Sequence, residues 1–201
     1  NTAIGASALQ TLNAGASGFN TAAGFEAGKA MTTGIKNTIL GGLAGTAITS
    51  GAQNTALGYA ALFQDTQGKY TTAIGWGSLQ TQNFTSDVAT YNTAVGYNTG
   101  AAVTTGTLNT LIGGLAGDAL TTGDSNVALG YNALSADTLG ARSIAIGRDA
   151  LAVQNFTSGT NTFNVAVGDR AGASVTTGVQ NTLIGGLAGD ALTDADYNVA
   201  I

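Results

Sequence analysis

"NTLIGGLAGDAL" occupies residues 109–120 and recurs unchanged at 181–192, while a near copy, "NTILGGLAGTAI", stands at 37–48. The three copies start at residues 37, 109 and 181, so they are 72 residues apart both times. They belong to a longer series in which a polar residue, Thr or Val, an apolar residue, an aliphatic residue and Gly follow one another. Such self-similarity at a fixed period predicts a single continuous repeat domain over residues 1–201. Its units start at residues 1, 20, 37, 54, 71, 92, 109, 126, 143, 164, 181 and 198.

The spacing of these starts predicts a solenoid built from 17-residue coils. Every fourth unit is longer, by four extra residues or by two in the first long unit, and this gives a 72-residue period of four coils. Positions 2 and 4 of each unit share one face of an extended backbone. Glycines at positions 5 and 15 predict two corners per coil, and hence two short strands. We therefore expect an all-β, parallel β-solenoid. The turn glycines at position 5 are Gly5, Gly24, Gly41, Gly58, Gly75, Gly96, Gly113, Gly130, Gly147, Gly168 and Gly185.

Asparagine stands at position 1 of ten of the twelve units. Stacked Asn side chains can form hydrogen bonds along the axis of a stacked-strand structure. The sequence therefore predicts an asparagine ladder that runs from coil to coil.

The apolar residues of the later part of each unit show a compensating shift. Where position 9 is Gly, as at Gly100, position 12 is aliphatic, as at Val103. Where position 9 is Leu62 or Leu134, position 12 is Asp. This predicts that every coil buries one aliphatic side chain here, supplied by position 12 in some coils and by position 9 in others. The two aspartates are expected to form weak surface ion pairs, Asp65 with Lys69 and Asp137 with Arg142.

The composition excludes several classes of function. The chain has no His and no Cys, so it lacks the usual nucleophilic relays and zinc ligands, and no two carboxylates recur at a spacing typical of an acid–base pair. We expect no enzyme activity, no catalytic residue, no cofactor and no metal. The net charge of −5, with six scattered basic residues, argues against nucleic acid as a partner. No apolar run approaches ~18 residues, so we expect no membrane insertion.

The glycine-rich phrase itself has two readings. "GGLAGD" at 113–118 and 185–190 lacks the Lys and Ser or Thr of a phosphate loop, and it misplaces the third glycine of a calcium turn. We interpret it as a structural turn, with a bound cation as the alternative. Just beyond the corner, position 6 carries Tyr59, Trp76, Tyr97 and Tyr131, which we expect to face solvent or a boundary between subunits.

The long units suggest loops that project from the rod. "QNFTS" occurs in both, and loops on a rigid scaffold often carry binding residues. The alternative is that the aromatic side chains fold back over the neighbouring coil and seal a groove. The candidate contact residues are Asn83, Phe84, Thr85, Tyr91, Asn155, Phe156, Thr157 and Phe163.

Each coil contains only about three substantial aliphatic side chains, which is little apolar surface for the backbone that must be ordered. Association of several copies around a shared axis would bury more of it. We therefore expect an obligate homo-oligomer, and we expect the sequence to be a segment of a longer chain.

The phrases "NTAIG" at 1–5 and "SIAIG" at 143–147 resemble the head repeats of YadA-like trimeric autotransporter adhesins. "NTALGYAAL" at 54–62 and "NVALGYNAL" at 126–134 also look like repeats of bacteriophage tail-fibre and virion appendage proteins. The resemblance implies a left-handed β-roll, a homotrimeric rod, and a location in the virion or at the cell surface. The 17-residue coil is longer than that of the autotransporter heads, which favours the phage relatives.

Four functions follow as hypotheses. The first is the shaft of a phage tail fibre, with other virion proteins and a host-surface glycan or protein as partners. The second is the head of a bacterial trimeric autotransporter adhesin. A carbohydrate-cleaving tailspike would need a carboxylate pair, and an ice-binding solenoid would need a flat Thr-x-Thr ladder; neither is seen in the sequence.

Overall fold

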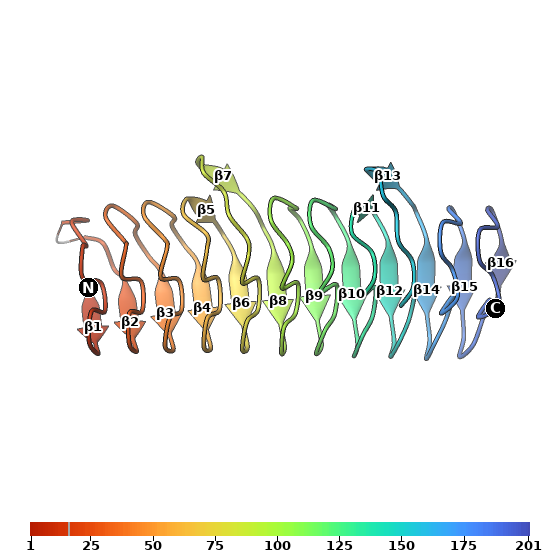
Figure 1. Cartoon of the computed structure of the whole chain (residues 1–201), viewed down its shortest axis with the longest axis horizontal. Coiled ribbons are helices and arrows are strands. Elements are labelled where there is room, and N and C mark those ends of the chain that lie inside the picture. Colours follow the sequence, from red (N-terminus) through yellow and green to blue (C-terminus); the bar gives the residue numbers. More distant parts are fainter. Residues whose placement is uncertain (16) are drawn as a thin grey trace.

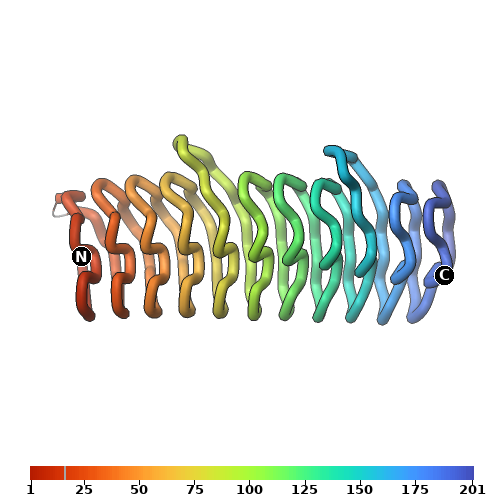
Figure 2. Tube along the Cα trace, viewed as in Figure 1, coloured from red at the N-terminus to blue at the C-terminus, as the bar shows by residue number. Residues whose placement is uncertain are grey.

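The computed structural model describes residues 1–15 and 17–201, and within them it contains strands and turns but no helix. The chain winds into a parallel β-solenoid of about twelve turns, and successive coils lie side by side along one axis (Figures 1 and 2). Each predicted repeat start coincides with the start of one turn. The all-β solenoid with a 17-residue repeat is thus confirmed, since equivalent residues of adjacent coils, such as Asn109 and Asn126, hydrogen-bond at this interval.

One parallel sheet runs the full length of the rod. Each repeat phrase contributes one short strand, and equivalent residues pair from coil to coil, as Thr110 does with Val127 and Leu111 with Ala128. The twelve strands, in sheet order, are β1 (Thr2–Ile4), β2 (Thr21–Ala23), β3 (Thr38–Leu40), β4 (Thr55–Leu57), β6 (Thr72–Ile74), β8 (Thr93–Val95), β9 (Thr110–Ile112), β10 (Val127–Leu129), β12 (Ile144–Ile146), β14 (Val165–Val167), β15 (Thr182–Ile184) and β16 (Val199–Ala200).

The expectation of two strands in every coil is wrong. Among the described residues, a second strand occurs only around the long units that start at residues 71 and 143, where β5 (Gly68–Lys69) pairs with β7 (Val88–Ala89) and β11 (Gly140–Ala141) pairs with β13 (Thr160–Asn161). Elsewhere the second side consists of turns, joined by single backbone bonds such as Thr104 N to Thr121 O at 2.9 Å. The extra residues of a long unit bring Val88 alongside Gly68 and Thr160 alongside Gly140, and this additional pairing forms the second strand there.

The two recurrent glycines serve different purposes. Gly113, at position 5, has a φ of 127°, and a Cβ there would lie 2.5 Å from the carbonyl oxygen of Gly130 in the next coil. Gly106, at position 15, has no left-handed φ, yet its Cβ would lie 2.5 Å from the oxygen of Gly123. The first position therefore requires glycine for both conformation and space, and the second for space alone.

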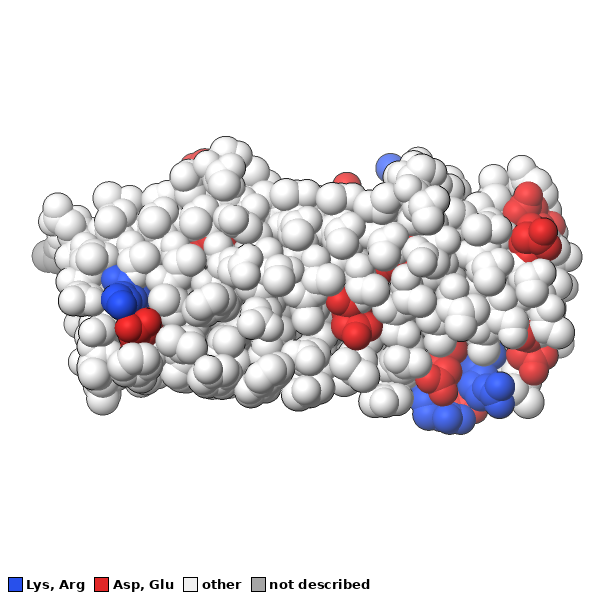
Figure 3. Space-filling model, viewed as in Figure 1, with Lys and Arg blue, Asp and Glu red and all other residues white. Residues whose placement is uncertain are grey.

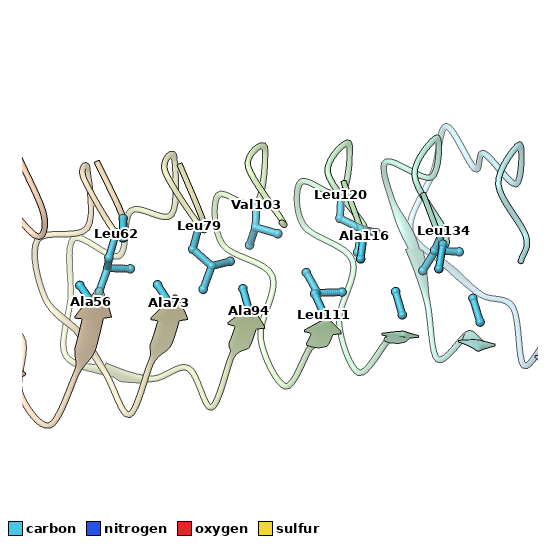
Figure 4. Packing of buried hydrophobic residues seen from close by; sticks show 14 of the residues in the cluster. Ala56, Leu62, Ala73, Leu79, Ala94, Val103, Leu111, Ala116, Leu120 and Leu134 are labelled. Atoms are coloured by element: carbon cyan, nitrogen blue, oxygen red, sulfur yellow. The ribbon is translucent and has the colours of Figure 1, made fainter. Parts of the chain in front are cut away.

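The core is a narrow column of side chains between the sheet and the turns (Figure 4). The residue at position 3 of the repeat unit, which is the middle residue of the strand, points inward, so that Ala94 and Leu111 are fully buried. The predicted aliphatic shift is confirmed, because Val103 is buried in one kind of coil and Leu134 in the other. A Cβ on Gly100 would come within 2.7 Å of Leu111 Cδ1, so glycine at position 9 makes room for neighbouring core side chains.

The predicted asparagine ladder is present and buried. The Asn109 side chain accepts a hydrogen bond from the Asn126 N–H at 2.9 Å and donates one to the Gly123 carbonyl at 2.9 Å. Its own backbone N–H donates to Asn92 Oδ1 at 2.9 Å. The same pattern recurs along the rod and is interrupted only at the long coils. Each asparagine thus ties its own coil to the next and satisfies backbone groups that have no access to water.

We predict that Asn109→Ala lowers the free energy of unfolding by about 2–5 kcal/mol, because the Asn126 N–H and the Gly123 carbonyl lose their buried partner. Urea unfolding followed by the fluorescence of the single tryptophan measures this. Thr122→Ala, at an exposed position in the same coil, is the control and should change stability by less than about 0.5 kcal/mol. Equal effects of the two variants would contradict a structural role for the ladder.

Candidate functional site

Two loops project from the same side of the rod, at β7 and β13 (Figures 1 and 2). They correspond to the two predicted units with four extra residues, which start at residues 71 and 143. Each loop returns to the rod as a two-residue strand, with Val88 paired to Gly68 and Thr160 paired to Gly140. The four extra residues therefore form a defined projection.

A buried aspartate holds the base of each loop. Asp65 Oδ1 accepts hydrogen bonds from the backbone N–H groups of Gly68 and Phe84, both at 3.1 Å, and its Oδ2 accepts one from Gln82 at 2.8 Å. Asp137 repeats this arrangement in the second loop, with Gln154 as the amide donor at 2.6 Å. Each carboxylate thus joins the coil before the loop to the first residues of the loop itself.

The glutamine completes a polar network that replaces the asparagine ladder in the long coil. Gln82 Nε2 also donates to Thr71 Oγ1 at 3.0 Å, and its Oε1 accepts from Asn92 Nδ2 at 2.9 Å. Thr71 and Thr90 share a hydroxyl–hydroxyl bond of 2.7 Å. These groups are buried, and the donors are matched to acceptors, so the network fixes where the loop leaves and rejoins the rod.

The structure corrects the expected ion pairs of Asp65 and Asp137. Both aspartates are fully buried, and they accept hydrogen bonds from neutral groups. Lys69 pairs instead with Asp87 at the loop tip, at 2.6 Å. The sequence did contain a signal for the buried role, since Asp and Gln occupy position 12 of consecutive units in both 72-residue periods.

The predicted contact residues divide into two groups. Phe84 and Phe156 are only 6% and 7% exposed, so the expectation that they are displayed is wrong; they point inward at the loop base, as the alternative proposed. The others lie at the surface of the two loops: Asn83, Thr85, Tyr91, Asn155, Thr157 and Phe163. Any contact made by the loops would involve this second group.

At the end of each loop, the last residue of the long unit stacks on the last residue of the unit before it. The Tyr91 ring lies over Tyr70, with centroids 5.2 Å apart and planes within 5°. At the equivalent place in the second loop, the Arg142 guanidinium lies 5.7 Å from the centre of the Phe163 ring. The two loops therefore have the same backbone support but present different surface chemistry.

The outer face of the main sheet is an uncharged surface that runs the length of the rod. Position 2 carries Thr, Val or Ile and position 4 carries Ala, Val, Leu or Ile, and neither position is charged in any coil. Side chains at position 4 remain accessible, with Leu57 at 43% and Leu129 at 41% exposed. Figure 3 shows how sparse charge is on one side of the rod, where acidic and basic side chains form only small patches.

Residues 1–15 and 17–201 contain no group of three or more potential metal ligands and no pocket, and no helix there could cross a membrane. In "GGLAGD", burial raises the pKa of Asp118, whose Oδ1 has no hydrogen-bond partner among these residues. A single carboxylate of this kind is not a cation site.

No protein-family model, no curated protein and no solved structure matches this chain. What can be said of its function therefore rests on the chemistry of the loops, the outer sheet face and the corners.

Burial raises the pKa of the Asp65 carboxyl above its ordinary value of 3.8, against the opposing effect of its hydrogen bonds. The folded chain thus binds the proton more readily than the unfolded chain, and this contribution to stability grows as pH falls through the folded pKa. We predict that wild type gains stability relative to Asp65→Asn between pH 7 and pH 4, measured by urea unfolding. The same comparison with Asp87→Asn, at an exposed carboxylate, should show no such gain. A constant difference for Asp65→Asn would contradict the prediction.

Proposed function

We propose that this chain is a structural and adhesive segment of an attachment fibre, as in the shaft of a bacteriophage tail fibre. In this proposal it has no catalytic role. The uncharged outer face of the main sheet, with its continuous apolar column at position 4, is the observation that carries the proposal, because it extends over the full length of the rod. A long apolar surface of this kind is typical of an interface between proteins.

We infer that the partner on this face is a second and third copy of the same chain. Identical rods can align their columns of position 2 and position 4 side chains coil by coil, which a partner of another period could not do. Three copies around one axis would bury the exposed position 4 side chains, such as Leu57 and Leu129. The resemblance of the repeats to YadA-like heads and phage-fibre proteins supports the same assembly.

The projecting loops fit an attachment role in such a trimer. They rise on a side of the rod with rigid supports beneath them, and each chain carries two of them (Figure 1). A trimer would therefore display six, so weak single contacts with a host surface would be reinforced by avidity. The same geometry would serve the head of a bacterial surface adhesin, and we propose a virion or cell-surface location in either case.

Light scattering behind a sizing column tests the assembly. We predict a mass of about 59 kDa, three times the 19.7 kDa of the chain, in an elongated particle. Leu129→Lys should disrupt the trimer, because it places three charges on the proposed interface; the residue is already exposed in the single chain, so the substitution removes no core contact.

Leu108→Lys is the matched control. Leu108 is also exposed, at 54%, but it lies at position 17, away from the outer face of the sheet. This variant should keep the mass of wild type. A monomeric wild-type protein, or a trimer that Leu129→Lys leaves intact, would overturn the proposed interface.

A further inference from the structure

A column of aromatic side chains stands at position 6, just past the glycine corner. The rings of Tyr59 and Trp76 stack with centroids 6.1 Å apart, and those of Trp76 and Tyr97 with centroids 5.3 Å apart. All three side chains are about half exposed, so the core does not require them. Phe25 and Tyr131 extend the column and are also exposed. Exposed aromatic side chains gathered in this way are typical of surfaces that bind another protein.

The stacked rings are held in place by the single chain. The Tyr59 carbonyl accepts a hydrogen bond from the Gly77 N–H at 3.0 Å, and the Trp76 carbonyl accepts one from the Asn98 N–H at 2.9 Å. The planes of each stacked pair lie within 18° of parallel. A surface fixed in this way loses little conformational freedom when it docks, and this favours binding.

The corner presents a flat surface and not a cavity, since the described residues form no pocket. The faces of the stacked rings are turned toward one another, so it is their edges that remain accessible. Such a surface, with one member per coil, best fits a partner that has the same spacing. A second copy of this chain has that spacing.

The outer face of the sheet is by itself narrow for a stable interface. Its twelve strands extend over about 53 Å at ~4.8 Å per strand, and positions 2 and 4 lie about 7 Å apart at ~3.3 Å per residue. The flat area of this strip is thus about 370 Å², whereas a standard interface buries ~800 Å² on each partner. Position 6 lies two residues beyond position 4, so including its column roughly doubles the width of the strip.

The opposite edge of the sheet is obstructed. The two loops project along that edge, so a neighbouring rod would meet them before it reached the sheet (Figure 1). The corner differs, because no unit carries an insertion between positions 1 and 9. A second rod can therefore approach the corner along its whole length.

We propose that the aromatic corner at position 6 docks against a neighbouring copy of this chain, beside the outer sheet face. This inference rests on the proposed assembly and adds a second, aromatic surface to its contact. Tyrosine and tryptophan bury large areas at low entropic cost, so they supply most of the binding energy of this edge. Farther along the column, Arg148 and Asp169 pair with each other at 2.9 Å, so neither of them brings an unpaired charge to the contact.

The single tryptophan tests the proposal directly, because Trp76 is 45% exposed in the single chain and becomes covered when the corner docks. We expect acrylamide to quench its fluorescence at least about threefold less strongly in the wild-type trimer than in Leu129→Lys, since water is excluded from the centre of an interface. The emission of the trimer should also lie at shorter wavelength.

Tyr131→Lys tests the same edge without touching the reporter. Tyr131 is exposed, so the substitution removes no core contact, and its ring is not stacked on Trp76. We expect it to raise the dissociation constant of the assembly at least about tenfold, measured by light scattering over a dilution series. Tyr131→Phe, which keeps the ring, and Leu108→Lys, on the obstructed edge, should stay within about twofold of wild type.

Two results contradict the aromatic contact while the proposed assembly stands: a wild-type trimer whose Trp76 is quenched as strongly as in Leu129→Lys, or a Tyr131→Lys variant that assembles like wild type. A wild-type monomer contradicts the proposed assembly itself, and the aromatic contact falls with it. The mass of every sample is therefore measured beside its fluorescence.

Discussion

The close approach of consecutive coils at the position 5 corner constrains everything else in this rod. A Cβ on Gly113 would meet the Gly130 carbonyl at 2.5 Å, and equivalent contacts recur from Gly5 to Gly168. Because no other residue fits there, every coil turns at the same place and stacks at the spacing of β-strands. Each position of the repeat unit therefore lies next to the same position in the coil before it and in the coil after it.

This constant stacking turns each position of the repeat into a column with its own chemistry. Position 3 forms the core column, position 1 the asparagine ladder, and positions 2 and 4 the uncharged outer face. A buried polar column is stable only if every member is satisfied. That explains why the ladder changes its members together where a loop is inserted: Thr71 replaces asparagine in the same coil in which Gln82 and Thr90 complete the hydrogen bonds.

The sequence predicted what strict periodicity controls: the coil starts, the asparagine ladder and the compensating shift between Leu62 and Val103. It did not predict the left-handed residues at positions 7, 9 and 17, such as Leu115 and Leu108, because non-glycine side chains rarely adopt that conformation and no residue type marks it. Nor did it predict that, among the described residues, a second strand pairs only where a long unit follows, as Gly68 does with Val88. The burial of Asp65 was also missed, since it looks like a surface residue until the loop closes over it, whereas the inward position of Phe84 was one of two possibilities that the sequence left open.

Comparison of the two 72-residue periods separates the columns that are kept from the columns that vary. Gln82 and Gln154 are the same residue in the same network, whereas Trp76 and Tyr97 are replaced by Arg148 and Asp169. Adjacent coils still touch at position 6, because the stacked rings are replaced by an ion pair of 2.9 Å between Arg148 and Asp169. The aromatic surface, however, is lost. The rod can therefore change its corner chemistry coil by coil without disturbing its core. Binding specificity is most readily built at such corners and loops, and least readily in the buried columns that hold the coils together.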